Sequence, residues 1–532
     1  MKIGQSNDRQ LEKQRGGWLL FLLLVLALGV WLGQAGLMGW LGAGWEDLAR
    51  VVAGGDTAVL PTLVIDMPFD NYNTILQQRD EAQTQGVFIA DEADFVAATM
   101  ELAGAVVRVR MRLLPGTAVH LNDDDKWNFD IRTRDDALLL NMQRFQLRDP
   151  ADNNWLNEWA FLENLRREGL LATRYQFVQV QFNGNDWGIY ALQEGFGPEL
   201  ATTQARPDGV MVEFAAERLW QSVAYFEGDL AAAIADPVTN LTADAFPLFE
   251  VDTFRDAAIA DDPVLAAQKD SAIALLRGLQ AGELTAAQVF DVAQYGRFLA
   301  LVDLWGATEA VSLVNVRYYY RAADGRLEPI GFNGNPLRGN GRLPLNATYN
   351  DPDLQAAYVR AAQEVSQPEY LAQLEADLAA EWESWATAVR PETPATPPWQ
   401  TLAQRQALMR QSLAPRQPIF ATLGSPALSH EGLVQIDVAN VLNLPIEIVG
   451  FDIDGAAFLE PDPAWLISGE GYTLPAFDGQ SLHFTRFHLP LTALQDPELT
   501  FQQEPTIYIA TRLVGQETVT LTPARPGIAI QP

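Results

Sequence analysis

The chain has 532 residues, of which 48% are hydrophobic and 20% charged, as in an ordinary globular protein with room for two or three domains. Its 68 acidic residues outnumber its 36 basic residues, and the resulting formal charge of −32 argues against nucleic acid as a partner. The absence of cysteine excludes disulfides, zinc–thiolate sites and thiol nucleophiles.

The first predicted element is a membrane anchor. Residues 18–41 are almost entirely apolar, and at about 1.5 Å rise per residue they can span a hydrocarbon core of about 30 Å. Basic residues precede this run, so residues 1–17 should stay in the cytoplasm. A cleaved signal peptide is the alternative, but the run is long for one and no Ala-x-Ala site follows at once. We predict a single-pass cell-membrane protein, with residues 42–60 as a tether and the main domains outside the cytoplasm.

The next segments predict an α+β domain. Residues 63–67 are typical of a short buried strand, and residues 69–78 of a short helix. Residues 106–113 alternate between apolar side chains and arginines, which indicates a strand with one buried face. Residues 126–132 are predicted to be its partner strand.

A helix and a hairpin follow. Residues 155–168 carry apolar side chains on one helical face, residues 152–154 offer capping side chains, and Gly169 stands where the helix should stop. The stretch 173–194 then alternates on both sides of an Asn-Gly pair that begins at Asn183, which predicts two strands joined by a tight turn.

The later part of the chain is less uniform. Residues 199–284 are rich in Ala and Asp, and we expect them to form a variable insertion or a second small lobe with a weak helix over 270–279. Beyond them the pattern predicts, in order, a core helix over 288–308, a hairpin over 314–332, a loop over 333–336, a long helix over 368–389, a Pro-rich break over 391–398 and a short helix over 402–413. Short alternating runs separated by Pro, Gly and Asp then predict a β-sandwich over residues 416–532.

The helix–hairpin unit also carries a resemblance. Its sequence REGLLATRYQFVQVQFNGNDWGIYALQEGFG, residues 167–197, resembles the central block of the CotH family of atypical, kinase-like phosphotransferases. The family pattern there is a helix ending near Gly, an aromatic strand, an Asn-Gly turn with Gly-x-Tyr, and then a Glu. The resemblance covers residues 61–415 apart from 199–284. It implies a CotH kinase-like fold, with ATP and Mg²⁺ or Mn²⁺ as cofactors.

The same resemblance assigns roles to individual residues. Glu309 stands where the family has its catalytic Asp, and Asn315 keeps a metal-facing amide. Asn333 and Asn335 replace the two acidic residues of the family's metal-binding turn. Because Mg²⁺ is held by carboxylates and water, losing both carboxylates predicts weak or absent metal binding.

The resemblance assigns two further residues to nucleotide binding or to support of the nucleotide-binding lobe. Lys126 matches a lysine of a family segment that resembles Lys-Lys-Ser-Tyr-Lys, whereas Asp130 replaces a basic residue of that segment. Glu194 ends the hairpin and would support the nucleotide-binding lobe. Each of these residues also has a purely structural interpretation. Lys126 would be a lysine on a strand face, and Glu194 would pair with a nearby arginine. Residues 333–336 would likewise be an ordinary turn.

Three functions remain open. The favoured one is a degenerate kinase-like domain that acts as an envelope or surface binding module. The second is an active, divergent CotH-type protein kinase that uses Glu309 with Lys126 and Asn315. The third is a structural envelope protein whose β-domain binds a polymer or protein partner outside the cytoplasm.

Overall fold

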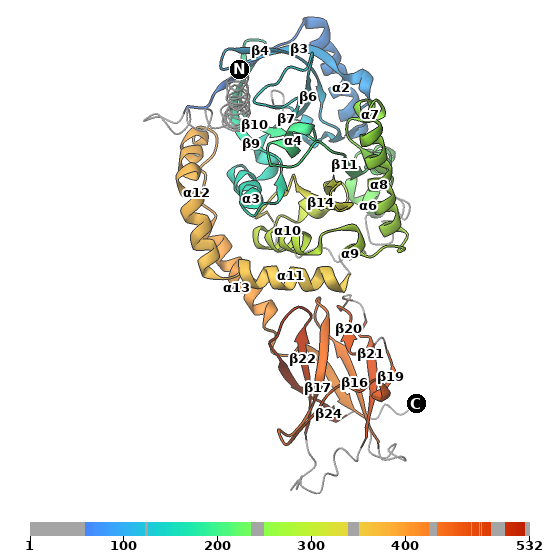
Figure 1. Ribbon diagram of the computed structural model, residues 1–532. Coiled ribbons are helices and arrows are strands. Elements are labelled where there is room, and N and C mark those ends of the chain that lie inside the picture. The colour runs from blue at the N-terminus through green and yellow to red at the C-terminus, as the bar shows by residue number, and fades with distance from the viewer. Residues whose placement is uncertain are drawn as a thin grey trace, which may run out of the picture.

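The computed structural model describes residues 59–122, 126–235, 249–338, 351–424, 433–469, 471–477, 479, 481–490 and 506–526 (Figure 1). The predicted anchor at residues 18–41 lies outside these ranges. Among the helices that are described, none has the length and apolar character needed to cross a bilayer. The described chain is a mixed α+β structure that contains a closed barrel and several further sheets.

A seven-stranded barrel forms the top of the molecule in Figure 1. Its closure depends on β1, which pairs antiparallel with β3 on one side and parallel with β9 on the other. The strands follow one another around the barrel in the order β1 (Thr62–Asp66), β3 (Val96–Leu102), β4 (Ala105–Leu113), β6 (Phe129–Thr133), β7 (Arg144–Arg148), β10 (Asn185–Glu194) and β9 (Tyr175–Phe182). The short pair β2 (Val87–Phe88) and β5 (Gly116–Thr117) stands apart from it.

Apolar side chains fill the barrel as the strand alternation predicts. On β4, Val109 and Met111 are fully buried, and the arginines between the apolar positions point away from this core. Aromatic rings pack at its centre, where the ring centroids of Phe182 and Trp187 lie 4.4 Å apart. Strand β6 begins at Phe129 and not at residue 126, which leaves Lys126 outside the ladder.

Helix α2 (Phe69–Gln85) lies against the barrel and is longer than predicted. Its second half carries few apolar residues, but Arg79 Nε and Gln83 Nε2 each donate a hydrogen bond of 2.9 Å to the Leu121 carbonyl oxygen. These tertiary bonds support a helical stretch that the hydrophobic pattern alone does not indicate. The helix ends at Gly86, whose φ of 74° is left-handed.

The helix–hairpin unit forms with one correction. Helix α3 (Leu156–Arg167) is followed by Gly169 with a φ of 75°, and the β9–β10 turn places Asn183 and Gly184 at positive φ, as predicted. The predicted amino-terminal caps are wrong, because Trp155 occupies the cap position and no side chain caps the helix. The Asp152 carboxylate instead accepts a 2.7 Å hydrogen bond from Asn128.

A second sheet lies between the barrel and the helices. Its strand order is β12 (Val251–Thr253), β11 (Met211–Phe214), β13 (Arg317–Arg321), β14 (Arg326–Gly331) and β8 (Leu171–Ala172). Residues 199–284 supply β11 and β12, so this region is part of the sheet and not a separate small lobe. The same region and its borders add helices α4 (Pro198–Thr202), α5 (Glu217–Tyr225), α6 (Leu230–Ala235), α7 (Asp256–Ala260) and α8 (Pro263–Gln280).

Helices α9 (Ala286–Val289), α10 (Val292–Trp305), α11 (Pro352–Val365) and α13 (Trp399–Leu413) lie below this sheet in Figure 1. Helix α12 (Pro368–Val389) runs up the side of the molecule beside α3. Helix α10 is the predicted core helix but is shorter than the predicted range 288–308, because Asp291 caps its start and Gly306 ends it. Helix α12 has the predicted bounds. Helix α11 was not predicted. It packs closely on α10, because a Cβ at Gly296 would lie 2.6 Å from the Ala357 carbonyl carbon.

After α13 the described chain is mostly β-strand. One sheet has the order β19 (Leu466–Ser468), β21 (Phe484–Pro490), β16 (Leu433–Asn440), β15 (Ile419–Leu423), β24 (Arg525–Pro526). The other has the order β18 (Ala457–Leu459), β17 (Ile446–Ile453), β22 (Ile507–Leu513), β23 (Thr520–Pro523), with β20 (Thr473–Leu474) paired to β17. The sheets share one core, in which the ring centroids of Phe451 and Phe487 are 5.6 Å apart.

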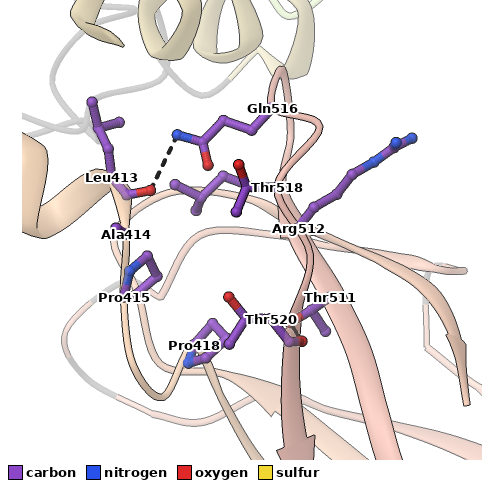
Figure 2. Close-up of a pocket in the computed structure, with 10 residues that line it drawn as sticks. Leu413, Ala414, Pro415, Pro418, Thr511, Arg512, Gln516, Thr518 and Thr520 are labelled. Atoms are coloured by element: carbon purple, nitrogen blue, oxygen red, sulfur yellow. Dashed lines mark hydrogen bonds between the residues drawn. The ribbon is translucent and has the colours of Figure 1, made fainter. Parts of the chain in front are cut away.

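The loop after β22 packs these sheets against helices α11 and α13. A small pocket lies at this junction (Figure 2), with a volume of about 90 Å³. Gln516 lines it and donates a 3.1 Å hydrogen bond to the Leu413 carbonyl oxygen. Gly515 has a φ of 94°, and a Cβ there would lie 2.6 Å from the Ala356 carbonyl oxygen. The contact therefore requires glycine, and it fixes the loop against both α11 and α13.

Candidate functional site

The loop after β14 brings four of the predicted site residues together. Asn335 Nδ2 donates a 2.7 Å hydrogen bond to Glu309 Oε1. Asn333 Nδ2 donates a 3.1 Å hydrogen bond to Asn315 Oδ1. Glu309 lies in a short 3₁₀ turn after α10, and Asn315 lies just before β13. Each asparagine of this loop therefore points its NH₂ group, and not its side-chain oxygen, at a residue that the resemblance assigns to catalysis or to metal binding.

The backbone of this loop is held in an unusual conformation. Asn333 and Asn335 have φ angles of 50° and 48°, in the left-handed region that asparagine tolerates better than most residues. Between them, Gly334 leaves no room for a side chain, because a Cβ would lie 2.6 Å from the Phe161 ring. The Phe161 side chain of helix α3 thus packs against the loop at Gly334 and restricts its conformation.

Glu158 on α3 anchors the loop directly. Its Oε1 accepts a 2.9 Å hydrogen bond from the Gly334 amide, and its Oε2 accepts a 2.8 Å bond from the Asn335 amide. The side chain is fully buried, and this burial raises the pKa of Glu158 to about 7, although the two amide bonds favour the charged form. Nothing in the sequence sets Glu158 apart, because it is a single acidic residue in the first turn of an apolar helix.

Lys126 lies in a second polar cluster. Its Nζ is 2.7 Å from Glu392 Oε2 and 3.6 Å from Asp149 Oδ1. The rings of Trp155 and Tyr190 flank it, each with a centroid 5.7 Å from Nζ. Burial raises the pKa of Asp149, an effect that the Ala151 amide and the Lys126 ammonium oppose. Two carboxylates therefore already neutralise the lysine.

Glu194 lies apart from the Lys126 cluster. Glu194 is paired with Phe145 in the ladder, at the start of β7, whereas Lys126 contacts Asp149, just beyond the end of that strand. The Glu194 carboxylate forms a buried ion pair of 2.6 Å with Arg174 and also accepts a bond from the Arg174 backbone amide. The structural interpretation of Glu194, an ion pair with a nearby arginine, is what the structure contains.

The connection between β7 and α3 links the two polar clusters. Asn154 Nδ2 donates a 2.7 Å hydrogen bond to the Pro336 carbonyl oxygen of the β14 loop. The next residue, Trp155, packs beside Lys126. Asp130, by contrast, belongs to neither cluster, because its carboxylate pairs with Arg112 on the neighbouring strand at 3.1 Å.

The donor set does not fit a magnesium ion. Glu309 is the one carboxylate among the four residues of the β14 loop cluster, and the amides of Asn333 and Asn335 present hydrogen atoms to the oxygens around them. Across the residues that the structure describes, no three acidic or histidine side chains gather closely enough to hold a metal ion.

No family model matches the sequence. No curated protein matches it significantly either. The assignment of a function therefore depends on the residues and their geometry, together with the resemblance carried by the helix–hairpin unit.

Proposed function

We propose that residues 61–415 form a CotH-like, kinase-related domain that has lost phosphotransfer and acts as a binding module of the cell envelope, held outside the cytoplasm by an anchor at residues 18–41. The observation that carries this proposal is the pair of amide hydrogen bonds from Asn335 to Glu309 and from Asn333 to Asn315. Without a cation, these bonds satisfy one oxygen of Glu309, which stands in the catalytic position, and the amide oxygen of Asn315. They also place NH₂ groups where the family has metal-binding carboxylates.

Charge explains why this replacement is severe. Mg²⁺ in phosphotransfer sites is held by carboxylates and substrate phosphates, and it neutralises the charge that develops on the phosphates. An amide oxygen can coordinate Mg²⁺ but contributes no charge. Turning the NH₂ groups of Asn333 and Asn335 away would also break two hydrogen bonds, at a net cost of about 1 kcal/mol each.

The surroundings of Lys126 support the same proposal. The Lys126 ammonium group contacts both Glu392 and Asp149, so a nucleotide phosphate would have to compete with two carboxylates for it. Glu194 is likewise committed to Arg174. Both side chains are therefore already engaged within the domain.

One observation favours the alternative, an active divergent phosphotransferase. The Oδ1 atoms of Asn333 and Asn335 are buried and accept no hydrogen bond. Rotating both amides by about 180° would turn these oxygens toward Glu309 and Asn315. That arrangement would repel the Glu309 carboxylate unless a cation lay between them, so the two proposals differ in whether a divalent metal binds.

The test restores the acidic turn. The double variant Asn333→Asp/Asn335→Asp returns two carboxylates beside Glu309, and we expect it to bind Mg²⁺–ATP at least about 10-fold more tightly than the wild type, which requires about 1.4 kcal/mol. Isothermal calorimetry with and without Mg²⁺ measures the change. The control Gln77→Glu/Asn185→Asp adds the same charge at exposed positions of α2 and β10. An equal gain in the control, or no gain in the test variant, would count against the assigned metal turn.

A further inference from the structure

A Pro-rich segment between α12 and α13 reaches the barrel through one side chain. Glu392 Oε1 accepts a 2.6 Å hydrogen bond from the Ile189 backbone amide on β10. Glu392 Oε2 accepts a 2.7 Å bond from Lys126 Nζ. Glu392 and Lys126 are 266 positions apart in the chain, so this contact ties the α12–α13 connection to the segment before β6.

The barrel is shaped to receive this carboxylate. The β9–β10 ladder shifts register between Asp186 and Gly188, which forms a bulge next to Ile189. Gly188 has a φ of 81°, and a Cβ at that position would collide with Glu392 Oε1. The bulge and Gly188 together leave space for one carboxylate group beside the Ile189 amide, and we call this space the carboxylate seat.

The groups around this carboxylate are hydrogen-bond donors of the kind that bind an oxyanion. One backbone N–H and one ammonium group donate to the two oxygens, and the rings of Trp155 and Tyr190 wall the lysine at 5.7 Å. The side chain of Lys126 is 15% exposed and that of Glu392 is 28% exposed, so solvent reaches the pair. Charge-assisted bonds of this kind are stronger than bonds between neutral groups.

We propose that Lys126 and the Ile189 amide form an oxyanion-binding site, and that Glu392 is a built-in occupant which an external ligand displaces. The ligand is a molecule that presents a single carboxylate or phosphate group. A group that carries more negative charge than a single carboxylate or phosphate is disfavoured. The Asp149 carboxylate would repel it, because Asp149 Oδ1 lies 3.6 Å from the same ammonium nitrogen. This inference rests on the proposed function in one respect, since the displaced segment would regulate what the binding module holds.

The experiment removes the charge of the occupant and keeps its hydrogen bond. In Glu392→Gln the amide oxygen can still accept from Ile189, but it no longer neutralises Lys126. We expect the full-length variant to bind inorganic phosphate or acetate at least about 10-fold more tightly than the wild type, measured by thermal shift in EDTA at constant ionic strength. Comparing the phosphate and acetate arms distinguishes the two ligand types. Glu375→Gln, which removes an exposed charge from α12, should bind as the wild type does.

Two further measurements identify the site. The double variant Lys126→Gln/Glu392→Gln should lose the gain, because the ammonium donor is gone. In the wild type, high phosphate should speed protease cleavage within residues 391–398 when Glu392 is displaced. Tighter binding that persists in the double variant would overturn the proposal, as would unchanged affinity in Glu392→Gln. All arms omit divalent metal, so their failure would leave the account of the Asn333–Asn335 turn intact, and the reverse also holds.

Discussion

The opposed titrations of Glu158 and His120 give a prediction that single variants can expose. Burial raises the pKa of Glu158 from 4.5 to about 7, and burial lowers the pKa of His120 from 6.5 to about 4. The folded state therefore favours the neutral form of both side chains. Glu158 contributes stability that is fully present below pH 4.5 and is lost as the pH rises toward 7. His120 contributes stability that is present above pH 6.5 and is lost as the pH falls toward 4.

The two contributions nearly cancel between pH 4.5 and 6.5. One pKa unit corresponds to about 1.4 kcal/mol, so across this interval each residue changes the free energy of unfolding by about 2 kcal/mol, in opposite directions. In Glu158→Gln only the His120 effect remains, and stability should rise by about 2 kcal/mol between pH 4.5 and 6.5 relative to the wild type. In His120→Gln stability should fall by a similar amount over the same interval.

Urea denaturation at several pH values measures these slopes, and unchanged m-values would show that the same unit unfolds in each variant. The double variant Glu158→Gln/His120→Gln should return to the pH dependence of the wild type, although its absolute stability will be lower. The reasoning would be refuted if either single variant followed the pH dependence of the wild type. It would also be refuted if the two single variants shifted in the same direction.

Three further predictions concern the framework. Gly515→Val should lower the thermal unfolding midpoint by several degrees, because its side chain would collide with the Ala356 carbonyl group at the junction; an unchanged midpoint would argue against that contact. Glu194→Gln should destabilise the fold by about 3 kcal/mol, since it leaves the buried Arg174 charge uncompensated, and chemical denaturation would measure the loss. Protease added to intact spheroplasts should digest the domains after Leu41, and their protection would contradict the proposed topology.

Local signals explain what the sequence could predict. The Asn183–Gly184 turn formed as expected because both residues favour the positive φ that a two-residue hairpin requires. Helix α12 (Pro368–Val389) begins at a proline and carries a regular apolar stripe, so its bounds could also be predicted. Closure of the barrel by β1 and β9 could not, because parallel pairing between distant strands leaves no short-range pattern.

The candidate site divides in the same way. Resemblance to a family motif placed Glu309, Asn315, Asn333 and Asn335 together, and the structure brings them into hydrogen-bond contact. The sequence could not predict the roles of Glu158 and Glu392, the two carboxylates that accept hydrogen bonds from backbone amides at these sites. An acidic residue in an apolar helix or a Pro-rich break is usually exposed to solvent, and only tertiary contacts reveal the backbone amides that these two accept from.

A calorimetric titration of the wild-type protein with Mg²⁺–ATP tests the central claim most directly. If the amides of Asn333 and Asn335 have replaced the metal ligands and Lys126 is already neutralised, the titration should give no binding heat beyond dilution, with Mg²⁺ or with Mn²⁺. Metal-dependent binding in the micromolar range or tighter, about −8 kcal/mol, would contradict the degenerate site and favour an active phosphotransferase.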